Sequence, residues 1–184
     1  MSTVSRKGTV PVWSVPVRLF HWSLVASVTT AWLGAEHVRN LHEYAGYAAA
    51  ALVAFRLVVG FVGSGYARFS QFVRSPLEVL RYMGDIMRGR ERRYVGHNPA
   101  GGAMVLALIA CICGIALTGW MQTTDAYWGV VWVENTHKFL GNAIVVLVML
   151  HIAGVLLASL RHGENLVRAM INGHKSAATS DDVA

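Results

Sequence analysis

Four long stretches of the sequence are almost wholly apolar, and shorter polar segments separate them. Three of these stretches, residues 19–35, 98–124 and 139–160, contain no Lys, Arg, Asp or Glu, and the fourth, residues 44–67, contains only Arg56 among those four types. A helix that crosses a bilayer needs about 20 mainly apolar residues, within a range of about 17–25. The pattern therefore predicts an all-α fold, an integral membrane four-helix bundle. We place its spans at about residues 17–36, 42–66, 99–123 and 136–160.

Amphipathic periodicity marks a further helix in the connection between the second and third predicted spans. In SPLEVLRYMGDIMRGR, which begins at Ser75, apolar residues share one helical face and charged residues point elsewhere. Ser75 suits the N-cap, Pro76 suits the first helical position, and Glu78 completes a capping box. We expect a short amphipathic helix at the membrane surface, although an ordinary linker helix would show the same pattern. A second short helix, ENLVRAMING, is expected after the fourth span and ends near Gly173.

The chain is expected to form one domain over residues 1–175, followed by a disordered tail over residues 176–184. Arg6 and Lys7 precede the first span, as basic residues precede the apolar core of a signal peptide. Leu33 and Ala35 do not form the pair of small residues that such a peptide needs for cleavage. We therefore expect the first span to be retained.

Composition and charge agree with a membrane location. Charged residues make up 14% of the chain, whereas soluble domains carry about 25%. Of the 16 Lys and Arg, all but Arg39, Arg56 and Lys138 fall in the N-terminal segment, the 68–97 connection or the C-terminal segment. With four spans these three regions share one side, which the positive-inside rule identifies as cytoplasmic. The net charge of +6 thus indicates topology, with both termini cytoplasmic, and does not indicate nucleic-acid binding.

Four histidines lie in the predicted spans or at their ends, at two depths. His137 and His151 lie fourteen positions apart, so they share a helix face and lie about 21 Å apart along its axis. His42 lies near the outer end of the second span, and His21 lies near the inner end of the first. Depth therefore pairs His42 with His137 on the outer side and His21 with His151 on the inner side. Two haems, each held by two axial histidines from different helices, require such pairs.

Histidines at these positions are also compatible with roles that need no cofactor. A single intramembrane histidine is often bonded to a neighbouring helix, and a row of them can form a proton or metal path. Transport sites usually recruit acidic residues or broken helices as well. Four histidines matched in depth favour haem over these alternatives.

Glycines and one arginine add to the haem interpretation. Gly46 and Gly141 each follow a histidine by four residues, and Gly154 follows His151 by three. A flat porphyrin needs backbone without side chains beside its ligand, although small residues also serve helix packing in membranes. Arg56 shares a helix face with His42 at the inner depth. We expect it to pair with a haem propionate, and snorkelling to the headgroups is the alternative.

At these residues the sequence resembles the prokaryotic cytochrome b561 family, which includes the cytochrome b subunits of nickel–iron hydrogenases. The resemblance implies a four-helix membrane bundle with two non-covalent b haems, bound through His21, His42, His137 and His151. The sequence departs from the family pattern at Ser14 and Val59, where relatives often carry an acidic residue and a tryptophan. The matching stretches are VWSVPVRLFHW (12–22), LHEYAGY (41–47), RLVVGFVGSGYARF (56–69), GHNPAGG (96–102) and HIAGVLLASLRHGENLVRAMING (151–173).

The resemblance implies a diheme electron carrier of the bacterial inner membrane. Such a carrier would link a periplasmic c-type cytochrome or redox enzyme with ubiquinone or menaquinone, and we favour an electron-transfer subunit over a self-contained enzyme. A stand-alone superoxide:quinone oxidoreductase is one alternative. The outer loops carry Arg39 and Lys138 against four acidic residues, which disfavours an anionic substrate. A transporter without a cofactor is the other alternative.

Overall fold

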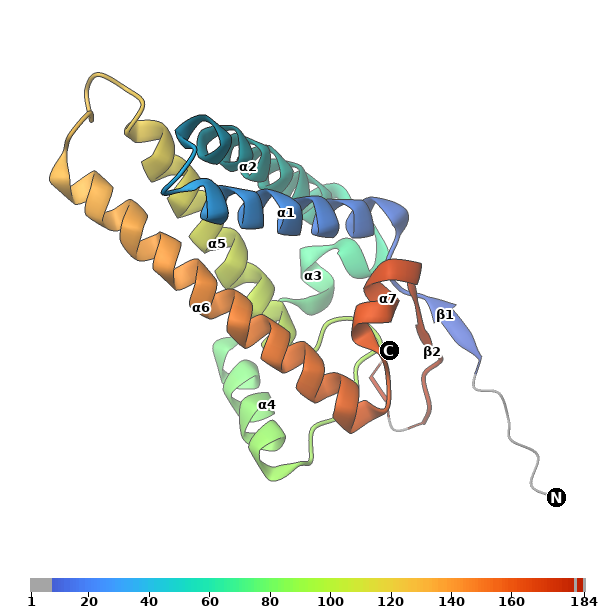
Figure 1. The fold of residues 1–184 in the computed structure, drawn as a ribbon. Coiled ribbons are helices and arrows are strands. Elements are labelled where there is room, and N and C mark those ends of the chain that lie inside the picture. The colour runs from blue at the N-terminus through green and yellow to red at the C-terminus, as the bar shows by residue number, and fades with distance from the viewer. Residues whose placement is uncertain (1–7, 181, 184) are drawn as a thin grey trace.

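A computed structural model describes residues 8–180, 182 and 183 of the chain. The basic residues Arg6 and Lys7, the start of the expected domain, and positions 181 and 184 of the expected tail lie outside the described residues. Four long helices dominate the described chain (Figure 1). They are α1 (Val15–Gly34), α2 (Arg39–Val62), α5 (Pro99–Met121) and α6 (Val131–His162).

The long helices form two antiparallel hairpins that pack side by side. Helix α1 packs against α2, α2 packs against α5, and α5 packs against α6 (Figure 1). Helices α2, α5 and α6 are long and apolar enough to cross a membrane, and α1 is not among the helices that meet this criterion. Arg18, His21 and several serines and threonines lower the apolar character of α1.

The ends of two helices differ from the boundaries expected from the sequence. Helix α2 ends at Val62, because the backbone turns extended at Gly63 and Gly65 then takes a positive φ of 57°. Helix α6 begins at Val131, five residues earlier than expected, directly after a turn in which Gly129 has a φ of 72°. It ends at a left-handed Gly163, the usual way to terminate a helix.

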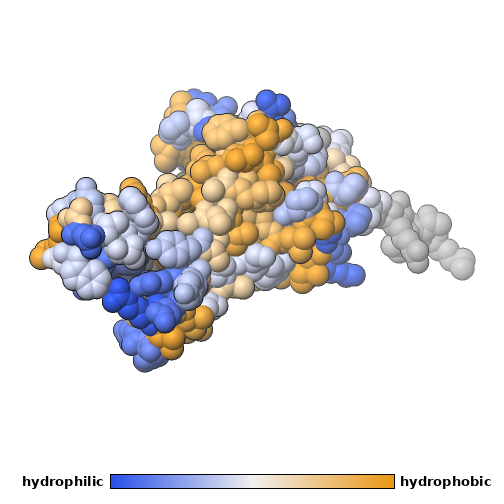
Figure 2. All heavy atoms as spheres, turned by 90° about the horizontal axis from the view of Figure 1, so that it is seen from above, coloured by the Kyte–Doolittle hydropathy of each residue, from blue (hydrophilic) through white to orange (hydrophobic). Residues whose placement is uncertain are grey.

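A small core fills the space between α2, α5 and the four-residue helix α3 (Phe69–Phe72). Gly60 permits this packing, because a Cβ at that position would lie 2.2 Å from the Phe69 ring. Many large apolar side chains stay on the surface, where Figure 2 shows a continuous orange region over the middle of the molecule. Val62, Phe139 and Leu160 are each about 70% exposed or more (79%, 70% and 83%). A lipid environment removes the cost of this exposure.

The short elements gather at one end of the bundle (Figure 1). Helix α4 (Pro76–Arg88) has the expected N-cap at Ser75 with a complete capping box to Glu78. Leu77, Leu80 and Met87 of α4 are exposed, which fits a helix at the membrane surface. Helix α7 (Leu166–Asn172) ends at a left-handed Gly173, as the sequence predicts.

Two short strands depart from the all-α expectation. Strand β1 (Thr9–Pro11) pairs antiparallel with β2 (His174–Ser176), so the described ends of the chain lie together. The Gly173 carbonyl also accepts hydrogen bonds from the backbone of Val12 and Trp13. The pairing joins segments at opposite ends of the sequence, and three-residue strands leave no local pattern from which to predict it.

Buried ion pairs hold the C-terminal segment, which was expected to be disordered from residue 176. Arg93, in the connection before α5, pairs with Glu164 and with Asp182. Lys175 lies 3.5 Å from the Glu164 carboxylate and donates to the Tyr94 carbonyl at 2.9 Å. Val183 donates its backbone N–H to the Arg93 carbonyl at 2.9 Å. The described residues of this segment are therefore docked, because they satisfy charges buried at the end of the bundle.

We predict that Arg93→Met releases the C-terminal segment. The substitution leaves two carboxylates buried without their main partner, and breaking a buried pair costs about 3–5 kcal/mol. Limited proteolysis should then cut within residues 174–183 much faster than in the wild-type protein. Arg39→Met is the matched control, because Arg39 and Glu43 form an exposed pair on one helix, and its removal should leave proteolysis unchanged.

Acid should release the same segment. Burial by itself raises the pKa of Glu164, but the hydrogen bond from Arg93 and the charges of Lys175 and Arg93 outweigh it, so the pKa of Glu164 is lowered. A lowered carboxyl pKa adds stability that is complete above the unfolded value of about 4.3 and is lost as pH falls through the folded value. Protection against an acid-stable protease should therefore hold at pH 6 and weaken progressively as the pH falls below about 4.3. Unchanged protection at pH 3 would contradict this assignment.

Candidate functional site

Two histidines from different helices face one another at the end of the bundle opposite β1 and β2. His42 lies in the first turn of α2 and His137 in the second turn of α6. Their ring centroids are 5.9 Å apart, with an angle of 78° between the ring planes. Two imidazoles bound on opposite sides of one metal ion by bonds of about 2 Å have centroids about 6 Å apart. The spacing therefore fits a shared metal ion between the rings.

Hydrogen bonds fix which nitrogen of each ring is free. The Nδ1 of His42 lies 2.8 Å from the Ala31 carbonyl oxygen, and the Nδ1 of His137 lies 3.1 Å from the Ile115 carbonyl oxygen. A carbonyl can only accept, so each Nδ1 carries the proton. Each Nε2 therefore keeps its lone pair, and a backbone carbonyl on Nδ1–H is the usual support of a metal-binding histidine.

Helix α5 supports the outer pair in a way that sequence reasoning missed. A Cβ at Gly119 would lie 3.1 Å from the His137 ring, so this glycine allows α5 to approach the imidazole. Thr118 Oγ lies 3.1 Å from His137 Nδ1 and also donates to the Gly114 carbonyl at 2.7 Å. The sequence did not indicate this support, because Thr118 and Gly119 lie on another helix and their distance from His137 along the chain follows no helical spacing.

The glycines singled out from the sequence lie beside open space. A Cβ added at Gly46, Gly141 or Gly154 would meet no atom within 4 Å among the described contacts. Tight packing would place neighbouring atoms there, as Phe69 does at Gly60 and Phe72 does at Gly102. The open space beside the three glycines fits a bulky group that the polypeptide itself does not supply.

The second histidine pair lies toward the opposite end of the bundle. His21 of α1 and His151 of α6 are both half-buried and close enough for their charges to interact. The Nδ1 of His21 is buried and has no hydrogen-bond partner among the described residues. The structure thus gives a ring distance for His42 and His137 and an electrostatic interaction for His21 and His151, and the pairing as haem ligands stays a prediction.

Unpartnered nitrogen atoms concentrate around this inner pair. Within the described part of the chain, four buried side-chain nitrogens lack a partner, and all lie in the half of the bundle toward β1 and β2. Arg56 is the most buried of these residues, with 5% exposure, and its guanidinium lies 4.8 Å from the Phe69 ring centroid. The guanidinium nitrogens of Arg18 and Arg56 are always donors, and buried donors without acceptors are costly, so these two arginines fit an anionic group. The four atoms are Arg18 Nε, His21 Nδ1, Arg56 Nη1 and His97 Nδ1.

His97 is not solvated, contrary to the expectation for a loop histidine. Its ring lies between the rings of Trp13 and Phe72, each with its centroid 4.7 Å away. Burial, followed by the positive charges of Arg56 and Lys175, lowers the pKa of His97 to about 3. The imidazole is therefore neutral at physiological pH, and it is a member of the inner cluster that local sequence could not reveal.

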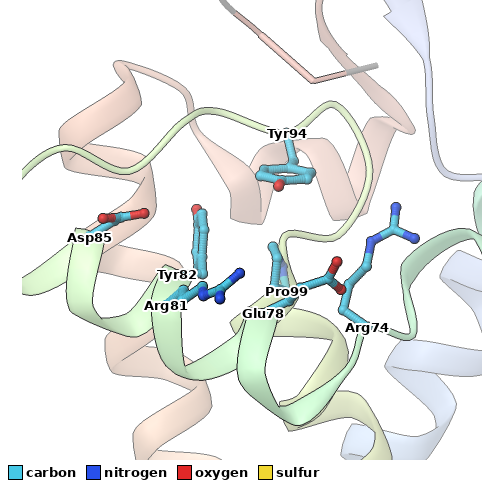
Figure 3. Close-up of a pocket in the computed structure, with 7 residues that line it drawn as sticks. All are labelled: Arg74, Glu78, Arg81, Tyr82, Asp85, Tyr94 and Pro99. Carbon is cyan, nitrogen blue, oxygen red and sulfur yellow. The ribbon is translucent and has the colours of Figure 1, made fainter.

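A charged cavity beside α4 lies apart from the histidine pairs. Its volume is about 200 Å³, and Figure 3 shows Arg74, Arg81, Glu78 and Asp85 around it, with Tyr82 among them and Tyr94 above. Two arginines and two carboxylates line this cavity, so their formal charges cancel. None of the four histidines of the long helices lines the cavity. This cavity does not take part in the candidate site.

The site fits a metal held by a cofactor more closely than a metal held by protein alone. In the described chain no group of three or more His, Cys, Asp and Glu could hold a metal ion. A porphyrin brings four ligands of its own and needs only two axial nitrogens from the protein. Paired imidazoles, open space beside glycines and the buried guanidinium nitrogens of Arg18 and Arg56 match the iron, the ring and the propionates of haem b. The fold and the site together define a helical membrane protein with the features of a haem-binding electron carrier.

Comparison with known proteins agrees with that class. The family described as prokaryotic cytochrome b561 matches residues 12–173, and the chain belongs to this family. It is similar to a probable Ni/Fe-hydrogenase B-type cytochrome subunit of Rhodobacter capsulatus, with 24% identity covering 96% of this chain and 85% of the relative. A subunit of the same description from Bradyrhizobium diazoefficiens is also 24% identical, covering 92% and 87%. No solved structure matches significantly. The chain is thus a membrane-integral b-type cytochrome, which binds haem b and transfers electrons.

We predict that Thr118→Val raises the midpoint potential of one haem. The valine keeps the shape of the side chain but removes the oxygen beside His137 Nδ1–H, so the imidazole becomes a weaker electron donor to iron. The shift should be on the order of tens of millivolts in a spectroscopic redox titration. Thr123→Val is the control, because Thr123 bonds only the Trp120 carbonyl in the described contacts. Equal shifts in both variants would rule out a contact specific to His137.

Proposed function

We propose that this protein is a diheme cytochrome that carries single electrons across the bacterial inner membrane. One haem b would be bound by His42 and His137 and the other by His21 and His151. The observation that carries this proposal is the outer pair, whose 5.9 Å ring spacing and carbonyl-bound Nδ1 atoms suit two axial ligands. Each bound haem iron supplies one-electron chemistry between its ferric and ferrous states.

We propose that α1 completes a bundle of four spans. Helix α1 packs against α2 and carries His21 of the inner pair, which supports a position in the membrane beside its neighbour. The basic segments gather with β1, β2, α4 and α7 at one end (Figure 1). By the positive-inside rule that end and both termini are cytoplasmic, and His42 and His137 lie toward the periplasm.

The inner haem would be oriented by a buried arginine. Arg56 lies on α2 at the depth of His151, and its Nη1 lacks an acceptor in the described structure. A propionate would accept from this guanidinium in the paired geometry that arginine favours. The 5% exposure of Arg56 supports this role over snorkelling, which would place the guanidinium in water. Gly46 and Gly141 would make room for the outer ring and Gly154 for the inner one.

The protein residues set the distance and the energy of electron transfer. His137 and His151 lie on one continuous helix. The two iron atoms that they would bind therefore lie at depths about 21 Å apart along the helix axis. The porphyrin rings would cover much of this gap. The two haems would have different surroundings. Carbonyl oxygens bond the ligands of the outer haem, whereas arginines lie near the inner haem, so the two haems should differ in midpoint potential.

The proposed partners lie on opposite sides of the membrane. The relatives are described as hydrogenase cytochrome subunits, which supports a periplasmic redox enzyme or c-type cytochrome as one partner. The outer connections and adjoining helix ends carry Glu36, Glu43, Asp125 and Glu134, so a partner with a basic face would dock there. Ubiquinone or menaquinone would be the partner within the membrane.

The alternatives gain less support. Superoxide is an anion, and the acidic outer end would repel it. A cofactor-free transporter would use broken helices at its binding site, whereas α2, α5 and α6 run without interruption.

We predict that His42→Ala and His137→Ala each remove the same haem. Loss of either axial ligand leaves the outer iron with a single histidine, whereas the inner pair is untouched. Low-temperature reduced spectra and EPR should show one and the same low-spin component missing from both variants, and the haem content should fall by half. His37→Ala is the control, because His37 is exposed outside the helices. If the two variants lost different components, the pairing would be wrong.

A further inference from the structure

The exposed side of α4 repeats one feature every seven residues, an apolar side chain followed directly by an arginine. The three pairs, all six residues of which are exposed, are Val73–Arg74, Leu80–Arg81 and Met87–Arg88. The first pair precedes the helix, and the other two lie inside it. Since seven residues make about two helical turns, the third pair lies on the same face as the second, about 10.5 Å farther along the axis. A row of arginines therefore lies beside a row of apolar side chains.

The arginine row lacks an acidic partner in the described part of the chain. None of the ion pairs among the described residues includes Arg74, Arg81 or Arg88. Arg74 donates to the carbonyl of the nearby Gln71 at 3.2 Å, which leaves its charge in place. Arg74 and Arg81 also line the charged cavity of Figure 3. The positive charge of the row is thus available to a partner outside the chain.

The two acidic residues of α4 offset this charge only in part. The Glu78 carboxylate closes the capping box by accepting from the Ser75 N–H at 3.2 Å. Glu78 and Asp85 lie about 40–60° farther round the helix than Arg81, on the side away from Leu80. Residues 74–90 contain four arginines and these two acids, which gives a net charge of +2.

Helix α4 is held at the inner ends of the spanning helices. It packs against α5, and Arg161 near the end of α6 donates to the Ile86 carbonyl at 2.6 Å (Figure 1). The Tyr82 ring is buried, and its hydroxyl donates to the Arg92 carbonyl at 3.2 Å. These contacts fix the side of α4 that faces the protein. They leave Leu80 and Met87 65% and 87% exposed, at the level where the apolar helices end.

We propose that α4 binds anionic phospholipids of the cytoplasmic leaflet. The apolar row would enter the boundary of the acyl chains, and the arginine row beside it would lie at the depth of the lipid phosphates. A guanidinium binds phosphate oxygens through two parallel N–H groups. The cation of a zwitterionic head group would be repelled by the row, so the surface favours lipids with a net negative charge. This inference goes beyond electron transfer and does not depend on which histidines bind haem.

The location of the two rows favours lipid over a protein partner. Helix α4 lies beside helices that are long and apolar enough to cross a membrane, so the bilayer surface adjoins it. A protein bound to the same side of α4 would have to displace that surface.

The test removes one charge from the row. Haem-loaded protein in detergent is titrated with dioleoylphosphatidylglycerol and, separately, with dioleoylphosphatidylcholine, and bound lipids are counted by native mass spectrometry. The wild-type protein should prefer the anionic lipid. Arg81→Gln should lose about fivefold of this preference, and Arg81→Gln with Arg88→Gln about 25-fold, the effect of one and of two basic residues at a membrane surface. An unchanged preference in the double variant would overturn the proposal.

Arg168→Gln is the matched control. Arg168 is an exposed residue of α7 at the same end of the bundle, and it belongs to none of the ion pairs among the described residues. The substitution removes the same charge away from α4 and should keep the wild-type preference. A loss equal to that of Arg81→Gln would reveal a general effect of net charge and overturn the assignment to α4.

A second measurement needs no variant. Phosphatidylglycerol with a photoactivatable group near its glycerol is photolysed with the wild-type protein in nanodiscs, and labelled peptides are identified by mass spectrometry. Labels within residues 73–88 that excess phosphatidylglycerol removes, and phosphatidylcholine does not, support the site. Equal removal by both lipids would overturn the preference for negative charge. Labels confined to the spanning helices would show that α4 does not face lipid and would leave its exposed rows to a protein partner, which also overturns the proposal.

Discussion

The imidazoles of His42 and His137, one from each hairpin of the bundle, lie 5.9 Å apart between ring centroids, and the proposed function depends on this juxtaposition. The contact between His42 and His137 works only because each ring is already oriented by a carbonyl, from Ala31 on α1 and from Ile115 on α5. All four long helices therefore contribute to the outer site. An unpaired imidazole in an apolar bundle is costly, and a shared iron would satisfy both free nitrogens at once. The remaining architecture positions these rings and the open space between them.

The inner end of the molecule combines stability with the proposed function. Arg93, Glu164, Lys175 and Asp182 tie the connection before α5 to the C-terminal segment, and β1 pairs with β2 beside them. This framework fixes the Gly96–His97 segment, and with it the Trp13 and Phe72 rings that enclose His97. The buried nitrogens of Arg18 and Arg56 lie in the same half of the bundle. These ion pairs and strands thus surround the inner histidine pair.

The sequence was most informative where one periodicity decided the structure. Apolar runs predicted the long helices, and Ser75 with Glu78 predicted the start of α4. Depth along helices predicted that His42 meets His137. Contacts between distant segments were not predictable: Gly119 and Thr118 support His137 from another helix, His97 is buried by Trp13 and Phe72, and Asp182 docks on Arg93. In each case tertiary packing brings together residues from distant segments, and no spacing pattern in the sequence indicates the contact.

The most direct test of the diheme account is a count of haem per chain. Protein purified in mild detergent would be examined by a pyridine haemochrome assay and by a dithionite-reduced minus oxidised spectrum. The account predicts two b haems for each polypeptide, both low-spin because each iron has two histidine ligands. One haem per chain, or a high-spin component in the intact protein, would contradict the assignment of four histidines to two irons.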